Sequence, residues 1–88
     1  MLEFITIKNV QQAIAIWCKK LRKTEKITQQ ELAEQLALSP ITISKLENGE
    51  NATLETILKV LQYFDKMNVF HQFIQKQITE LDDTQSLY

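Results

Sequence analysis

Two helix-start signals stand close together in the middle of the chain and restrict its fold more than any other feature. Thr28 and Glu31 have the spacing of a capping box, in which the hydroxyl and the carboxylate satisfy backbone donors at a helix start. Ser39 followed by Pro40 has the form of an N-cap and a first helical position. The first of these helices is expected to end near Leu36, which leaves a connection of only about three residues. Helices joined by so short a connection must cross steeply, as in a helix-turn-helix.

Apolar residues at helical spacing predict three further helices around this pair. Asn9 and Gln12 have the form of another capping box, and Gly49 is suited to the left-handed conformation of a helix stop. The chain has one Gly and one Pro in 88 residues, so tight β-turns are scarce and an all-α fold is favoured. The five helices are expected roughly at residues 10–22, 29–36, 40–48, 53–65 and 70–81.

Two short segments have the composition of strands rather than helices. Residues 2–7 are rich in β-branched side chains, and residues 67–70 are the other candidate. Such strands would need each other or a second chain, since an isolated pair is marginal in water. The expected organisation is an N-terminal arm or strand at 1–9, a helix-turn-helix domain at 10–66, a dimerisation or partner helix at 67–82 and a disordered tail at 83–88.

The inventory of reactive side chains argues against an enzyme, a metal site or a cofactor. Cys18 is the only cysteine, which excludes an intramolecular disulfide and fits a reducing cytoplasm. His71 is the only histidine and has no second ligand at suitable spacing. No apolar run approaches about 18 residues, and the N-terminus lacks the form of a signal peptide. We therefore expect a soluble, cytoplasmic, non-enzymatic protein.

The net charge of −1 is distributed unevenly along the chain. Residues 1–26 hold six basic against two acidic side chains, a net +4, whereas residues 27–66 carry −3 and residues 67–88 carry −2. An overall acidic chain can therefore still present a basic end to DNA. The basic segment includes a group of lysines that are expected either in solvent or on phosphate, namely Lys19, Lys20, Lys23 and Lys26.

The helix expected at 40–48 carries outward side chains that suit a DNA major groove. Ser44 offers a small hydroxyl, Ile41 an apolar surface for a thymine methyl, and Lys45 a long cation for guanine or phosphate. The alternative is that these are ordinary solvated positions, and residue types alone do not decide between the two interpretations.

The stretch TQQELAEQLALSPITISKLENGENATLETILKVL resembles the helix-turn-helix of the Cro/C1 (Xre) phage-repressor family, and the resemblance extends over about residues 10–66. Within that family the chain is similar to HipB-like antitoxins, through FITIKNVQQAI, ITIS and ATLETILKVL. The resemblance implies a five-helix, lambda-repressor-like domain. The chain departs from the family where Ala37 replaces the common turn glycine, and where Pro40 replaces a hydrogen-bonding residue.

Matching the family motif implies roles for particular residues. Gln29 would bind a DNA phosphate, helped by the positive end of its helix. Arg22 and Glu47 would form an internal salt bridge that supports the fold and does not read DNA. The residues placed at base edges are Ser39, Pro40, Ile41, Ser44 and Lys45, with Thr42 at the backbone or the groove floor.

The C-terminal third holds more large apolar side chains than a four-helix core needs. They are candidates for a dimer or partner surface, although completion of the monomer's own core is the alternative. A two-fold dimer on a pseudo-palindromic operator would supply the specificity that one small domain lacks. The residues concerned are Phe64, Met67, Val69, Phe70 and Phe73.

The sequence and the resemblance together predict a homodimeric repressor of transcription, specifically the antitoxin and autorepressor of a HipBA-like operon with a HipA-like kinase toxin as partner. A restriction-modification controller or a phage-type repressor remains open within the same class. In a different class stands a protein-interaction module that has a helix-turn-helix fold but does not bind DNA.

Overall fold

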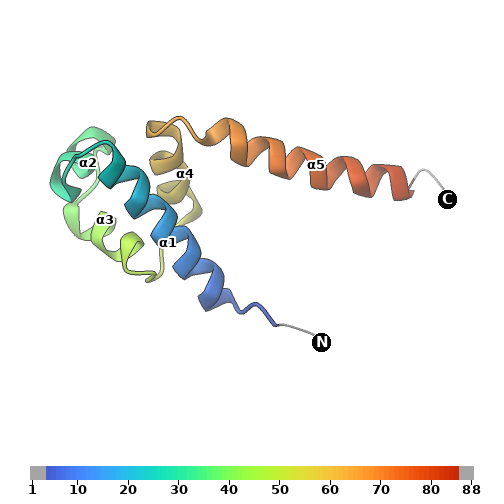
Figure 1. Cartoon of the computed structure of the whole chain (residues 1–88), viewed down its shortest axis with the longest axis horizontal. Helices are drawn as coiled ribbons and strands as arrows, with labels where there is room; N and C mark the ends of the chain where they lie inside the picture. The colour runs from blue at the N-terminus through green and yellow to red at the C-terminus, as the bar shows by residue number, and fades with distance from the viewer. Residues whose placement is uncertain (1–3, 86–88) are drawn as a thin grey trace.

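Five α-helices make up the regular structure of the computed structural model, which describes residues 4–85 and the side chains of residues 4–82 (Figure 1). The first four form a bundle, here called the head, and α5 projects from it. No strand occurs within residues 4–85, so the predicted all-α fold is confirmed. The helices are α1 (Ile7–Thr24), α2 (Gln29–Leu36), α3 (Pro40–Glu47), α4 (Leu54–Tyr63) and α5 (Met67–Gln85).

Side-chain caps fix where the head helices begin. Thr28, Ser39 and Thr53 are the N-caps of α2, α3 and α4, as their sequence signals predict. The start of α1 differs from the prediction, because Thr6 caps this helix and Asn9 is the return partner at its third position. Thr6 and Asn9 exchange two hydrogen bonds, of 3.1 and 2.9 Å, so a complete capping box starts the helix about a turn earlier than expected.

The N-terminal strand candidate is wrong where the structure describes it. Residues 4–6 have no regular structure and Ile7 is already helical, because the β-branched segment leads into the cap of α1. The part of this candidate before residue 4 lies outside the described residues.

The second strand candidate, residues 67–70, is also wrong. These residues form the first turn of α5, where their apolar side chains continue the helical spacing that follows. The same helix runs to Gln85, past the expected start of the tail at residue 83. The rest of that expected tail, residues 86–88, lies outside the described residues.

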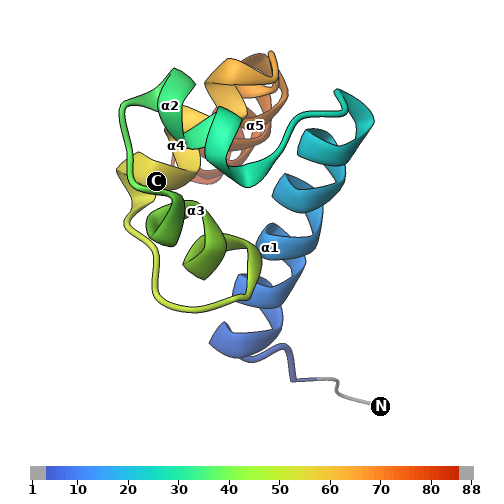
Figure 2. The same cartoon turned by 90° about the vertical axis from the view of Figure 1, so that its left-hand side faces the viewer.

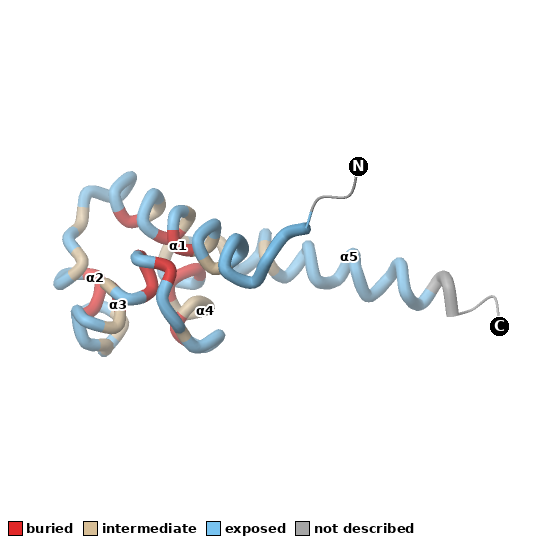
Figure 3. Tube along the Cα trace, turned by 90° about the horizontal axis from the view of Figure 1, so that it is seen from below, coloured by how far each residue is buried: buried red, intermediate tan, exposed pale blue. Residues whose placement is uncertain are grey.

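The core lies within the head and is contributed by all four of its helices. Cys18 from α1, Leu32 from α2, Ile43 from α3 and Val60 from α4 are almost completely buried and pack together. Each fully buried aliphatic side chain of this kind stabilises the fold by about 1.5–3 kcal/mol relative to an exposed one. Figure 3 shows the buried residues confined to the head, whereas α5 is exposed along most of its length.

A left-handed residue makes the tight turn between α2 and α3. Ala37 caps the end of α2 with φ 56° and ψ 42°, and its N–H donates to carbonyl oxygens of the preceding turn. The chain then enters the cap of α3 at Ser39, so α2 and α3 cross on one side of the head (Figure 2). The predicted connection is therefore present, and alanine adopts a conformation that glycine would adopt at lower cost.

None of the helices in residues 4–85 combines the length and the apolar character that crossing a membrane requires.

Candidate nucleic-acid interface

The outward face of α3 is distinct from the face that holds it in the head. Ile43 and Leu46 are buried against the other helices, whereas Ile41 is 67% exposed and Lys45 is also exposed. Ser44 is half-buried between the two faces. A helix with this profile presents a row of short side chains flanked by one long cation, which is a shape that fits the major groove.

The N-terminal end of α3 uses its hydroxyl groups for capping. The Ser39 Oγ accepts a hydrogen bond of 3.1 Å from the Thr42 backbone N–H, and the two hydroxyl oxygens lie 2.9 Å apart. Pro40 occupies the first helical position and is exposed. The hydroxyl groups of Ser39 and Thr42 already take part in the cap of α3. A contact from either residue to DNA would therefore use a hydroxyl that also forms a capping hydrogen bond.

Asn48 lies one helical turn beyond Ser44 and belongs to the same outward face. Its Nδ2 donates to the Ser44 Oγ at 3.5 Å, and the residue is exposed at the C-cap of α3. The sequence motif indicates Asn48 only as part of a helix stop. Its spacing of four from Ser44 could have identified it, and an amide is the side chain that reads adenine most directly. We define the recognition face as Ile41, Ser44, Lys45 and Asn48.

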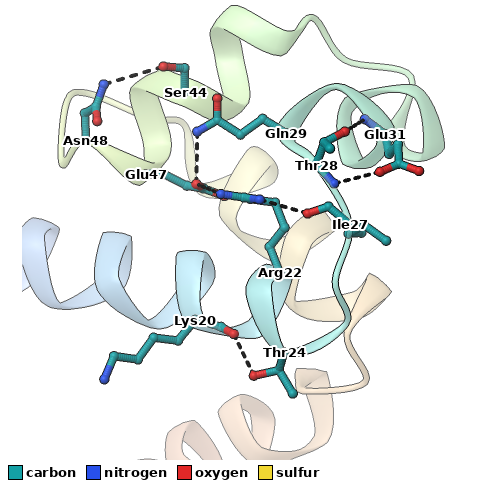
Figure 4. A network of polar contacts seen from close by, with 10 residues as sticks. All are labelled: Lys20, Arg22, Thr24, Ile27, Thr28, Gln29, Glu31, Ser44, Glu47 and Asn48. Atoms are coloured by element: carbon teal, nitrogen blue, oxygen red, sulfur yellow. Dashed lines mark hydrogen bonds and ion pairs between the residues drawn. The ribbon is translucent and has the colours of Figure 1, made fainter.

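A buried ion pair connects α1 to α3 behind this face (Figure 4). The Arg22 Nε and the Glu47 Oε2 lie 2.7 Å apart, and the Arg22 Nη2 donates to Glu47 Oε1 at 2.9 Å. The third Arg22 contact is from Nη1 to the Ile27 carbonyl oxygen, at 2.8 Å. A planar guanidinium that is bidentate to one carboxylate and also bonds a loop carbonyl fixes three segments of chain relative to each other.

Gln29, the expected phosphate ligand, lies in the same network. Its Nε2 donates to Glu47 Oε1 at 3.0 Å, so the side chain reaches from the first turn of α2 toward α3 (Figure 4). An amide nitrogen carries two N–H groups, so the other one is left for a second acceptor. Gln29 is half-buried and held in place by this hydrogen bond. A side chain held in this way is better suited to a positioned contact than one that rotates freely.

The electrostatics of the pair keep both partners charged. Burial on its own would raise the pKa of Glu47, but hydrogen bonds from Arg22 and Gln29 and the nearby positive charges of Arg22 and Lys19 outweigh it, so the pKa is lowered. The hydrogen bond to Glu47 in turn raises the pKa of Arg22 above its ordinary value. The carboxylate is therefore ionised at neutral pH, and its charge is compensated inside the head.

A polar depression adjoins the C-terminal end of α3. It is lined by Lys45 and by residues from α1 and from the loop after α3. Lys8 reaches this loop, with its Nζ donating to the Gly49 carbonyl oxygen at 3.4 Å. Lys8 and Lys45 both line this depression although they are far apart in the sequence. Residue spacing alone therefore does not identify Lys8 as a neighbour of Lys45. The lining residues are Lys8, Gln11, Lys45, Gly49, Glu50 and Asn51.

The five residues expected at a dimer or partner surface do not share one environment. Phe64 packs against the core and makes an edge-to-face contact with Tyr63, with ring centroids 5.0 Å apart. Phe70 is half-buried at the start of α5. The structure therefore joins Phe64 to the head and leaves the α5 side chains outside it. The exposed members of the set are Met67, Val69 and Phe73.

The remaining residues with reactive side chains have ordinary structural surroundings. Burial, with a smaller effect from Glu47, raises the pKa of the Cys18 thiol to about 11, so this thiol is not an activated nucleophile. His71 is exposed, and its Nε2 lies 3.3 Å from the Gln75 amide nitrogen. Among the described residues, no three His, Cys, Asp or Glu side chains gather where they could hold a metal ion.

Comparison with known families agrees with this geometry. A family model described as helix-turn-helix matches residues 19–66, which include α2, the tight turn and α3. The chain belongs to this Cro/C1-type helix-turn-helix family. A search of curated proteins finds no match. As a member of the helix-turn-helix family, the chain is a DNA-binding regulator of transcription.

Proposed function

We propose that this helix-turn-helix protein is a sequence-specific repressor that occupies a pseudo-palindromic operator as a homodimer. The observation that carries the proposal is the recognition face of α3, where Ile41, Lys45 and Asn48 are exposed while the opposite face of the helix is buried in the core. In a bound complex α3 lies in the major groove, and Gln29 at the start of α2 binds a phosphate. Lys8 and Lys45 add cations at the other end of α3.

The residues along α3 have different proposed roles in DNA binding, which follow from the contacts that each makes in the structure. Ser39 and Thr42 set the position of the helix start, because their hydroxyls are used in the cap. The next two residues, 40 and 41, contribute apolar contacts to the groove. Ser44, Lys45 and Asn48 carry the polar contacts to base edges or phosphate, so a few side chains determine the sequence preference together with the deformability of the DNA.

We further propose that the regulated operon encodes a toxin, with this chain as the antitoxin and a HipA-like kinase as its partner. The support is the resemblance of the N-terminal segment, of ITIS and of the ATLETILKVL segment to HipB-like antitoxins. A restriction-modification controller and a phage-type repressor use the same recognition face and differ in the genes that they control. Copurification from the native operon tests this assignment, since a kinase that coelutes supports it and its absence contradicts it.

A gel-shift titration with the protein's own promoter tests the DNA-binding proposal. Lys45→Ala and Ser44→Ala are expected to weaken specific binding by about 1–3 kcal/mol each if they contact bases. Lys76→Ala is the matched control, because it removes the same charge from an exposed position on α5. Binding that is insensitive to Lys45→Ala and Ser44→Ala, or that does not depend on salt, would contradict the repressor and favour a protein-interaction module that does not bind DNA.

A further inference from the structure

Within the described residues 4–85, the α5 helix has almost no packing partner. Its main contact is with α4 at its N-terminal end, and every described side chain from residue 71 to residue 82 is exposed. Figure 1 shows the helix extending away from the head. Most helical stability in proteins comes from packing of an apolar face rather than from intrinsic propensity. A helix of 19 residues in this position therefore lacks a surface to pack on.

One side of α5 carries an apolar face, here called the α5 seam, which consists of Phe70, Ile74, Ile78 and Leu81. These residues recur at spacings of four, four and three, which aligns them in a single stripe along the helix. Ile74, Ile78 and Leu81 are 40, 44 and 61% exposed. Val69, although one of the residues expected at a dimer surface, projects from the other side of α5 by the same helical spacing and lies outside the seam. The seam is a continuous hydrophobic stripe of the kind that pairs helices.

Charged and polar groups along the edges of the seam change in character from one end of α5 to the other. Lys66, directly before α5, and His71 in its second turn lie at the N-terminal end. Asp82 lies toward the C-terminal end, on the same edge of the seam as His71. In two antiparallel copies, the N-terminal end of α5 in one copy, which carries the hydrogen-bond donors, lies beside the acidic C-terminal end of α5 in the other. In two parallel copies the acidic ends would lie together and repel each other.

We propose that the α5 seam binds the α5 seam of a second copy, with the two helices antiparallel. The proposal rests on the dimeric repressor described above and names the surface and the orientation of its dimer. The seam is nearly symmetric about residue 76, so pairing Phe70 with Leu81 of the second copy also brings Ile74 close to Ile78. The same register places His71 beside the acidic end of the second copy.

The oligomeric state of the full chain tests whether the seam is the interface. Ile74→Glu places a carboxylate in the seam and is expected to raise the dimer dissociation constant by about tenfold or more. Val69→Glu is the matched control, with the same substituent on the same helix but outside the seam, and should leave the constant within about twofold. Sedimentation equilibrium measures both constants, and circular dichroism follows the helical content of each variant.

Disulfide cross-linking tests the orientation. The double variant Phe70→Cys/Leu81→Cys should oxidise to a covalent dimer, because the two positions face each other across an antiparallel pair. Either single variant should not, since like positions would stand about 16 Å apart along the helix axis. Cys18 does not interfere because it is buried. Cross-linking of the single variants would overturn the antiparallel arrangement and indicate a parallel one.

The failures of the two proposals can be told apart. A dimer that persists unchanged in Ile74→Glu would overturn pairing through α5 and leave a dimeric repressor with another interface. A wild-type chain that is monomeric at every concentration would overturn the dimer itself. Loss of dimerisation in both Ile74→Glu and Val69→Glu would also overturn the seam as the determining surface. Contact between the recognition face and DNA is tested separately, by Lys45→Ala in the gel-shift titration.

Discussion

The carboxylate of Glu47 joins three of the four head helices. It lies in α3 and accepts hydrogen bonds from Arg22 of α1 and Gln29 of α2. Its side chain is almost completely buried, so removal of either charge would leave the other without compensation. The geometry of the recognition face therefore depends on a residue that is itself buried behind that face.

Arg22→Ala should lower the free energy of unfolding by about 3–5 kcal/mol, because it leaves Glu47 buried and unpaired. Lys59→Ala is the control, since it breaks the exposed pair of Lys59 and Glu55 in α4 and should cost about 0.5 kcal/mol or less. Urea unfolding followed by circular dichroism measures both variants. Similar losses in the two would contradict the structural role of the buried pair.

The same carboxylate predicts how stability changes with pH. The pKa of Glu47 is lower in the folded chain than the ordinary value of about 4.3, so its contribution is fully present above that value and is lost as the pH falls through the lowered pKa. Glu31, whose pKa is lowered by the cap hydrogen bonds of Thr28, changes stability in the same direction.

Urea unfolding at a series of pH values from neutral to acid, on the wild type and on Glu47→Gln, isolates the contribution of Glu47. We expect the wild type to lose more stability than the variant on acidification, since glutamine does not titrate. Parallel curves for the two proteins would contradict the lowered pKa.

The turn between α2 and α3 contains strain that a single substitution should relieve. Ala37→Gly is expected to raise the free energy of unfolding by roughly 0.5–1 kcal/mol, because glycine adopts a φ of 56° without the steric cost of a Cβ. Ala13→Gly is the control at an exposed position within α1, where the same change should cost about 1 kcal/mol. Thermal or urea unfolding measures the change in the free energy of unfolding, which is expected to be a gain for Ala37→Gly and a loss for Ala13→Gly. A loss of stability in both variants would contradict the prediction.

At the scale of whole helices, the sequence predicted the elements with local signals and missed those set by distant contacts. The Thr28 and Ser39 caps and the short turn between them were visible because capping depends on neighbouring residues. The start of α1 was misplaced because two overlapping capping patterns compete there. The shared surface of Lys8 and Lys45 was not foreseeable, since it depends on how α1 crosses the end of α3.

The assignment of residues 67–70 to a strand failed for a different reason. A short apolar segment has no period of its own, and only its continuity with the later residues of α5 identifies it as helical. The surface expected in this region was likewise split, because Phe64 belongs to the head core while Phe70 belongs to the α5 seam.

Hydrogen exchange should show that the protection of backbone amides depends on protein concentration in α5 and much less in the head. Amides of α5 are expected to gain protection as the protein concentration rises, because pairing with a second copy provides their packing, whereas amides of α1 to α4 should be much less dependent on concentration. Mass spectrometry of peptides from the two regions measures the difference. Equal protection at low and high concentration in α5 would contradict concentration-dependent packing.

At the scale of the whole molecule, the acidic chain carries its excess positive charge in the segment that includes α1. Lys8, at the N-terminal end of α1, adds one such charge beside the end of α3. Since each phosphate contact releases counterions, binding to DNA should weaken steeply with salt even though the net charge is −1.

Lys8→Ala should reduce the slope of log K against log salt by about 1 for each bound copy, with little change in sequence preference. Lys76→Ala should leave the slope unchanged, since this residue lies on α5 away from the recognition face. Fluorescence anisotropy over a range of salt concentrations measures the slopes. Equal slopes for wild type and Lys8→Ala would exclude a phosphate contact from Lys8.

The near absence of contact between α5 and the head has a consequence for how related regulators coexist. In the proposed dimer, substitutions along α5 would alter which chains pair without disturbing α3, and substitutions on α3 would alter the preferred DNA without disturbing pairing. Two such proteins in one cell would then acquire separate partners and separate target sequences through substitutions in different helices. A helix that stabilises so little of its own head leaves the two specificities free to evolve separately.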